Sequence, residues 1–140
     1  MKNRHDRYGR QALAALVVAG VAWLGVQCTA APTAEEQAAE AARTYYGHLA
    51  DGRYADYLSG VSGADSLPEA YREQLLVGAK QFRAQQQAAH RGIREVRVAT
   101  ARCDSALDVM NAFLVLCFGD STSEEVCVPM VERDGRWLMR

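Results

Sequence analysis

Apolar positions recur every three or four residues between about Thr33 and Gly92, and every second residue after Gly92. The first spacing is typical of helices that bury one face, and the second is typical of strands. The pattern therefore predicts a helical half of the chain followed by a sheet.

The first helix is predicted from Thr33 to a stop at Asp51-Gly52. Thr33 and Glu36 have the spacing of a capping box, in which each side chain accepts a hydrogen bond from the other residue's backbone N–H. One stripe of this helix is apolar and consists of Ala38, Ala42, Tyr45 and Leu49, with Tyr46 beside it.

Two further helices are predicted before Gly92. A short one covers residues 53–58, and a longer one begins near Ser66, where Ser66 and Glu69 repeat the capping spacing and Pro68 lies in the first turn. Gly92 suits a left-handed stop. The expected buried stripe of the longer helix is Leu67, Tyr71, Leu75, Gly78, Phe82, Gln85 and Ala89.

Four strands are predicted after Gly92. In the first, Val96, Val98 and Thr100 alternate with Arg97 and Ala99. The second, over residues 109–118, is apolar on both faces, which favours a central position. The third and fourth are marked by Val126, Val128, Met130, Trp137 and Met139.

Two turn and edge residues refine this sheet. Asp134-Gly135 is a strong signal for a two-residue hairpin. Pro129 cannot donate a ladder hydrogen bond, so its nitrogen should face a bulge or an unpaired edge. Because three helices of this size cannot each find a separate core, we expect one α+β domain over residues 34–140, with the helices laid across one face of a curved antiparallel sheet.

The first 27 residues have the order of a secretory signal. A basic start precedes an uncharged apolar run, residues 11–26, which is too short to span a bilayer comfortably. Cys28 follows this run directly, as the acylated cysteine of a lipoprotein precursor does, although Leu24 is displaced by one position from its usual place. The sequence predicts a signal peptide over residues 1–27, lipidation at Cys28 and a linker over residues 28–33; the alternative is ordinary cleavage after Ala30.

Charge excludes one class of partner. Residues 1–27 carry a net charge of +3, so the remainder carries −4. Nucleic-acid binding needs a clustered basic face. We therefore expect no nucleic-acid partner, and the sequence shows no motif for a cofactor.

Several segments resemble the nuclear transport factor 2-like superfamily. Residues 42–46 (ARTYY) and 49–54 (LADGRY) are similar to its opening helix, and residues 131–139 (VERDGRWLM) look like its last hairpin. Residues 65–72 (DSLPEAYR) resemble a subgroup of short exported lipoproteins that carry a domain of unknown function. The resemblance implies a cone-like fold of the cystatin or nuclear transport factor 2-like type, often with a pocket between helices and sheet, and sometimes a homodimer formed through the sheet.

An enzyme of this superfamily would usually place an Asp with a His or Tyr inside the cone. His48 lies three residues before Asp51, but Asp51 ends the helix and should face solvent. His90 ends the longer helix, where a cation complements the helix dipole. We therefore predict no catalytic residue. The candidate pocket residues are Tyr45, Tyr46, Tyr54, Tyr57 and Tyr71, whose alternative role is to pack in the core and its rim with their hydroxyls in water.

Three cysteines follow Cys28. No pair has the spacing of a metal site, so no metal is expected. Cys117 and Cys127 could form a disulfide if the loop between their strands centres near Thr122, whereas a loop centred at Ser121 would offset them. The alternative for these residues and Cys103 is that they remain free thiols.

Two functions stay open at this level. The first is an envelope lipoprotein, anchored to a bacterial membrane and facing the periplasm or cell surface, whose domain binds another protein or a small apolar ligand. The second is a small isomerase- or hydrolase-like enzyme that uses the cone pocket. An interior without ionisable side chains would favour the first, and a buried Asp or His facing a cavity would favour the second.

Overall fold

The computed structural model describes residues 30–140. The predicted signal peptide over residues 1–27 and the predicted lipidation site Cys28 lie outside the described residues. The elements are, in order, α1 (Ala34–Ala50), α2 (Tyr54–Ser59), the 3₁₀ turn η1 (Ala64–Ser66), α3 (Glu69–His90), β1 (Ile93–Asp104), β2 (Val109–Phe118), β3 (Ser123–Arg133) and β4 (Arg136–Met139). No helix in the described part of the chain is both long and apolar enough to cross a membrane.

Helix α1 begins and ends as the sequence predicts. The backbone N–H of Thr33 donates to the Glu36 carboxylate at 2.8 Å, and the N–H of Glu36 donates to the Thr33 hydroxyl at 3.2 Å. Both bonds of the capping box are therefore present. The helix stops at Asp51, and Gly52 follows with a φ of 75°.

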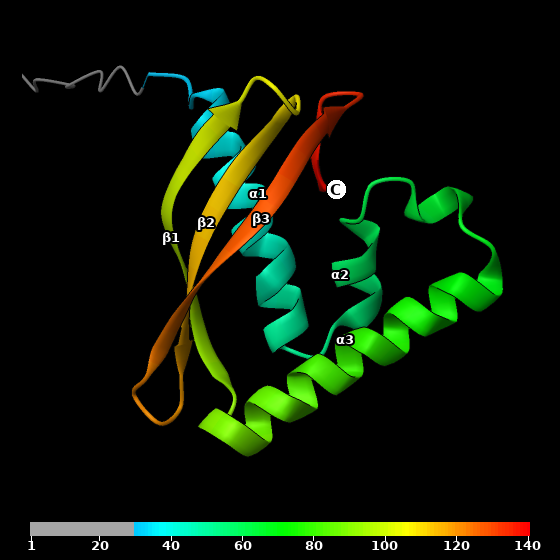
Figure 1. Cartoon of the computed structure of the whole chain (residues 1–140), viewed down its shortest axis with the longest axis vertical. Coiled ribbons are helices and arrows are strands. Elements are labelled where there is room, and N and C mark those ends of the chain that lie inside the picture. The colour runs from blue at the N-terminus through cyan, green and yellow to red at the C-terminus, as the bar shows by residue number, and fades with distance from the viewer. Residues whose placement is uncertain (1–29) are drawn as a thin grey trace, which may run out of the picture. The chain divides into compact units, whose positions relative to one another are not determined.

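The sheet is an antiparallel meander of four strands in the order β1-β2-β3-β4, and this confirms the predicted α+β class (Figure 1). The predicted central position of β2 is also confirmed. Its inward side chains are nearly inaccessible to solvent: Met110, Ala112, Leu114, Leu116 and Phe118.

Strand β1 differs from the predicted alternation. Val98 pairs with Leu114, whereas Thr100 pairs with Phe113, so the register shifts at Ala99. An extra residue in one strand reverses which face the following side chains occupy. Val98 and Thr100 therefore lie on opposite faces, and Ala101 takes the inward position expected for Thr100.

The last hairpin ties the sheet to the helical half. Asp134 and Gly135 have φ angles of 51° and 73°, the conformation that two-residue hairpins favour. On β4, the N–H of Met139 donates to the carbonyl of Gly60 at 2.7 Å, and the N–H of Ser62 donates to the carbonyl of Met139 at 2.7 Å. The final strand thus bonds to the segment that follows α2.

Pro129 of β3 lies beside the end of β4. Its carbonyl accepts a hydrogen bond from the N–H of Arg140, one residue beyond β4. The side of Pro129 that lacks an N–H therefore faces Arg140 and is bonded there through its carbonyl, so it is not the unpaired edge that the sequence predicts.

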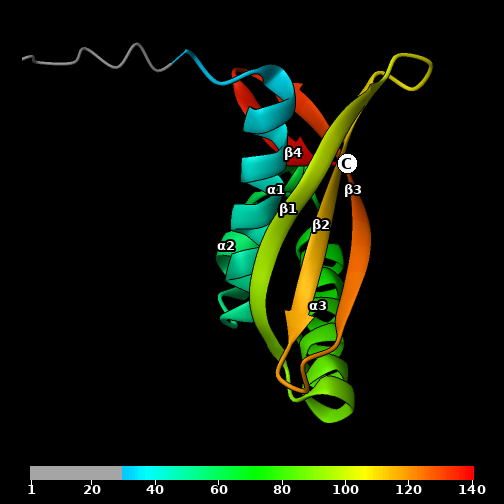
Figure 2. The same cartoon turned by 90° about the vertical axis from the view of Figure 1, so that its left-hand side faces the viewer.

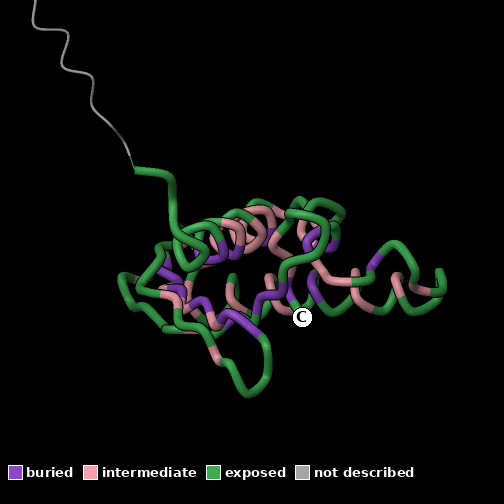
Figure 3. Tube along the Cα trace, turned by 90° about the horizontal axis from the view of Figure 1, so that it is seen from above, coloured by how far each residue is buried: buried purple, intermediate pink, exposed green. Residues whose placement is uncertain are grey.

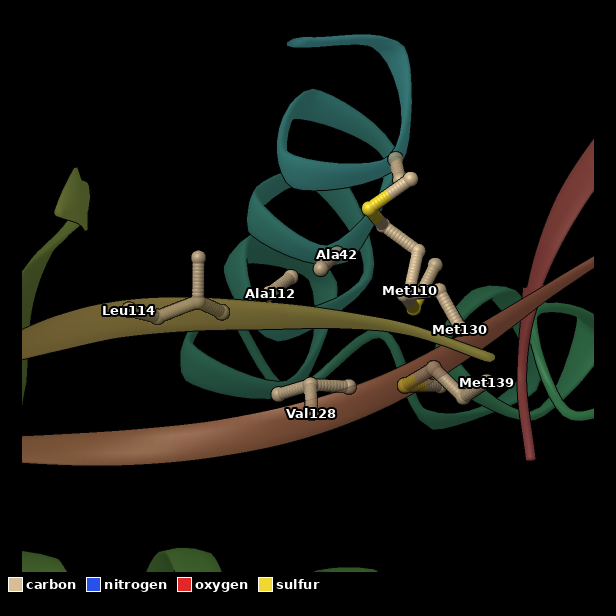
Figure 4. Close-up of a cluster of buried hydrophobic side chains, with 8 residues drawn as sticks. Ala42, Met110, Ala112, Leu114, Val128, Met130 and Met139 are labelled. Atoms are coloured by element: carbon tan, nitrogen blue, oxygen red, sulfur yellow. The ribbon is translucent and has the colours of Figure 1, made fainter. Parts of the chain in front are cut away.

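The main core lies between α1 and the sheet (Figure 4). Ala38 and Ala42 of α1 are fully buried, and their small side chains let the helix backbone approach the strands. Methionines fill the space at one end of this contact. The strand residues of the cluster are Met110, Ala112, Leu114, Val128, Met130 and Met139.

Only α1 lies along the sheet, whereas the sequence predicted all three helices across one face (Figure 2). Helix α2 packs on α1 and α3, and α3 contacts β1 and, through His90, Phe118 of β2. Of the 22 residues of α3, only Ala79 is buried. Figure 3 shows that the buried residues gather where α1 faces the sheet.

The start and the buried stripe of α3 are corrected by the structure. Leu67 is extended because Pro68 follows it, so the helix begins at Glu69, and Ser66 belongs to η1 and does not cap α3. The less exposed face contains Leu75, Ala79 and Phe82, with Arg72, Leu76, Arg83, Gln86 and His90. From the predicted stripe, Tyr71, Gly78, Gln85 and Ala89 are exposed.

The close contact between α1 and the sheet predicts the effect of a larger side chain. Ala42→Leu should lower the free energy of unfolding by about 1–3 kcal/mol, because three added carbons must fit where none are accommodated. Thr44→Leu, on the exposed face of α1, should change it by less than about 0.5 kcal/mol. Urea unfolding of both variants measures this; equal stabilities would show that the contact is loose.

Candidate functional site

A cavity of about 320 Å³ lies among the three helices. We call it the interhelical cavity. The resemblance implied a pocket between helices and sheet, but no strand residue lines this one. Its walls are Tyr46, Leu49, Tyr57, Leu58, Val61, Gln74, Leu75, Gly78, Ala79 and Phe82.

Two tyrosines meet at this cavity. The rings of Tyr46 and Tyr57 lie edge to face, with centroids 6.0 Å apart and planes at 88°. Burial raises the pKa of Tyr46 to about 12, and burial also raises the pKa of Tyr57. Both hydroxyls therefore stay protonated at neutral pH and can donate hydrogen bonds, but they cannot serve there as bases.

The other three candidate tyrosines lie outside the cavity. Tyr45 packs against Gly60 and donates its hydroxyl to the carbonyl of Trp137 at 3.1 Å. The ring of Tyr54 lies 5.8 Å from the ammonium of Lys80. Tyr71 is half exposed on α3. Of the five candidates, the structure brings Tyr46 and Tyr57 together at the cavity.

Sequence reasoning did not assign the α3 wall of the cavity to a site. Leu75, Gly78 and Phe82 were expected only as core residues. One signal was available: glycine in a helix interior costs about 1 kcal/mol relative to alanine. A Cβ at Gly78 would meet no atom within 4 Å, so packing in the described chain does not require this glycine. The absence of a side chain at Gly78 leaves space at the cavity wall.

His48 and Asp51 do not form an acid–base pair. Asp51 is exposed and pairs with Arg53 at 3.3 Å, as its position at the helix end predicts. His48 is half-buried, and its Nδ1 has no hydrogen-bond partner among residues 30–140. It does not line the interhelical cavity.

A second polar cluster lies where α3 ends. His90 Nδ1 is 3.0 Å from the carboxylate of Asp120, and Thr122 donates its hydroxyl to the same carboxylate at 2.6 Å. The His90 ring stacks on Phe118 with centroids 4.6 Å apart. Because the hydroxyl and the carboxylate both lie at Nδ1, the cluster lacks the order of a nucleophile, base and orienting acid. It clamps the end of α3 to the turn between β2 and β3.

The cysteines of the described chain are free. Cys117 pairs with Ser123, and Cys127 pairs with Phe113, so the loop centres near Asp120. The two thiols are thus offset by four residues, about 13 Å along the strands, which is too far for a bridge. The structure therefore excludes the Cys117–Cys127 disulfide. Residues 30–140 also hold no group of three metal-ligating side chains.

The comparisons with known proteins identify the fold. No family model and no curated protein matches the chain. A solved structure from Campylobacter jejuni, provisionally described as an NTF2-like (nuclear transport factor 2-like) transpeptidase, matches with a TM-score of 0.58 at 12% identity. The match covers 71% of this chain and 94% of the other. The domain has the nuclear transport factor 2-like fold, and at this identity the likeness shows the fold alone.

The clamp at the end of α3 predicts a pH dependence. Hydrogen bonds from Thr122, together with His90, lower the pKa of Asp120 from 3.8 to about 2. A carboxylate with a lowered pKa stabilises the fold above its unfolded pKa and loses this effect as pH falls toward its folded pKa. Asp120→Asn should therefore be less stable than the wild type at pH 7, and the difference should shrink between pH 4 and pH 2. Urea midpoints across this range measure it, and a constant difference would contradict the clamp.

Proposed function

We propose that this protein is a cell-envelope lipoprotein whose domain binds a small apolar ligand in the interhelical cavity without transforming it. The observation that carries the proposal is the chemistry of the cavity wall. Its lining residues are aliphatic or aromatic except for one glutamine and two tyrosine hydroxyls. Walls of this kind bind ligands by removing apolar surface from water, and a few polar groups set the orientation.

The wall offers no group for acid–base or nucleophilic chemistry at neutral pH. No carboxylate, imidazole or thiol lines it, and no charged or polar residue of the described chain is fully buried. The Tyr46 hydroxyl, with a pKa of about 12, acts as a donor. Neither Tyr46 nor Tyr57 bonds through its hydroxyl to another residue of the described chain, so both can bond to a ligand.

An enzyme would need a different arrangement. Among the described residues, His90 and Asp120 resemble an acid–base pair most. His90 lies eight residues beyond Phe82 along α3, which at 1.5 Å per residue places it about 12 Å from that wall of the cavity. The described cavity and the described acid–base pair are therefore separate. Fold likeness to a protein described as a transpeptidase carries no activity to this chain, because unrelated functions share this fold.

The volume limits the ligand. Small-molecule pockets are about 300–1,000 Å³, and this cavity of about 320 Å³ lies at the lower end. It suits one aromatic ring system or a medium-length alkyl chain.

Attachment to a membrane rests on the sequence. The apolar run over residues 11–26 ends directly before Gln27-Cys28, and small residues follow. Two acyl chains on Cys28 would hold the domain at a membrane, since each buried methylene adds about 0.8 kcal/mol. The Thr33 capping box starts the fold five residues after that cysteine, so the domain would lie close to the bilayer.

Filling the cavity should weaken the binding of an uncharged probe. We expect N-phenyl-1-naphthylamine to gain fluorescence with the wild-type domain. Gly78→Leu should weaken its binding at least about tenfold, because the new side chain occupies the cavity, while Ala84→Leu on the exposed face of α3 should leave it unchanged. Absence of binding to the wild type, or equal binding by both variants, would refute the proposed function.

The anchor has a separate test. Mass spectrometry of the detergent-extracted protein should show a chain that begins at Cys28 and carries acyl groups, and Cys28→Ser should remove both the added mass and the membrane association. An unmodified chain that begins at Ala31 would instead establish ordinary secretory cleavage.

A further inference from the structure

A second, smaller cavity adjoins the interhelical cavity. It has a volume of about 150 Å³ and lies between α2, η1 and α3. Leu58 of α2 and Leu75 of α3 line both cavities, so the two spaces are adjacent and this pair of leucines lies between them. Its wall is mostly apolar, and Arg72 supplies its cationic group. We call it the Arg72 cavity.

Arg72 is only partly satisfied. It lies in the first turns of α3 and is half-buried, and its Nη2 donates to the carbonyl of Ala64 at 3.0 Å. Its Nε is enclosed by protein and has no hydrogen-bond partner among residues 30–140. No carboxylate of the described chain lies within ion-pair distance of its guanidinium.

Guanidinium groups bind carboxylates through two parallel N–H donors. The bond to Ala64 already fixes the plane of the group, so an acidic oxygen that enters the cavity meets a positioned donor. Because Nε has no accessible surface, a ligand in the cavity can bond only to the terminal Nη groups of Arg72.

Asp65 also lines the cavity, but it is exposed and lies at the rim. Its negative charge would weaken the binding of an anion and favour that of a cation. The deeper group is Arg72, and charges act more strongly where water is excluded. The cavity therefore selects for an acidic group, and Asp65 moderates the affinity.

We propose that the Arg72 cavity holds the carboxylate of an amphipathic ligand whose apolar part occupies the interhelical cavity. The ligand class is thus an apolar monocarboxylic acid, with its head against Arg72 and its chain passing between Leu58 and Leu75 toward Tyr46 and Tyr57. This inference rests on the proposed function and adds the polarity and direction of the ligand.

Three ten-carbon probes test it: decanoate, decan-1-ol and decylammonium, each below its micelle-forming concentration. They share one chain and differ in head-group charge. Displacement of N-phenyl-1-naphthylamine from the wild-type domain at pH 7.5 ranks their affinities. We expect decanoate to bind about tenfold more tightly than decan-1-ol, and decylammonium to bind least tightly.

Two variants separate charge from folding. Arg72→Gln should reduce decanoate to the affinity of decan-1-ol and leave decan-1-ol unchanged. Asp65→Asn keeps Arg72 and its bond to Ala64, and it should tighten decanoate a few-fold. Thermal melting of both variants establishes that they are folded, and if Arg72→Gln unfolds, the Asp65→Asn result decides.

The outcomes distinguish the two proposals. If the fluorescent probe does not bind the wild type, the proposed function itself fails. If the probe binds but decanoate is no tighter than decan-1-ol, or Asp65→Asn weakens decanoate, the cavity pair binds apolar ligands and the role of Arg72 is overturned.

Discussion

The close packing of α1 on the sheet is the contact on which the rest of the fold depends. Ala38 and Ala42 leave the helix backbone close to the strands, and the large side chains of this core come from β2, β3 and β4. With the helix held there, Tyr46 and Leu49 are directed to the place where α2 and α3 arrive. The position of the candidate site therefore depends on how the alanine face of α1 packs on the sheet.

The weaker contacts of α2 and α3 explain why the cavities lie among the helices. A long helix with one buried residue cannot close tightly on its neighbours, so space remains along it on both sides of Leu58 and Leu75. The clamp of His90 on Asp120 holds one end of α3, and the bond from Arg72 to Ala64 holds the other. Between these ends, Arg83 of α3 donates through its Nε to the carbonyl of Ala50 at 2.9 Å.

Local signals predicted the parts of the fold that local chemistry controls. The capping box at Thr33, the central strand and the Asp134-Gly135 turn each depend on neighbouring residues, and each is present. The bulge at Ala99 and the offset of Cys117 from Cys127 depend on pairing between strands, which no single segment encodes. Pro68 was visible, but its effect on Leu67 outweighed the capping signal at Ser66.

The candidate site likewise has features that the sequence signals locally and features that depend on tertiary contacts. Tyr46 and Tyr57 were candidates because of their chemistry, but their meeting depends on the angle between α1 and α2. Arg72 gave no signal in the sequence, because an arginine near a helix start is ordinary until η1 is seen to fold over it. The space beside Gly78 was detectable only because glycine is an unfavourable residue in a helix interior.

The hydrogen bonds between Met139 and the Gly60–Ser62 segment set the order in which the molecule can be completed. The helical half is synthesised before β4, so the Gly60–Ser62 segment lacks these bonds until residues 136–139 have been made. Completion of this part of the domain therefore waits for β4.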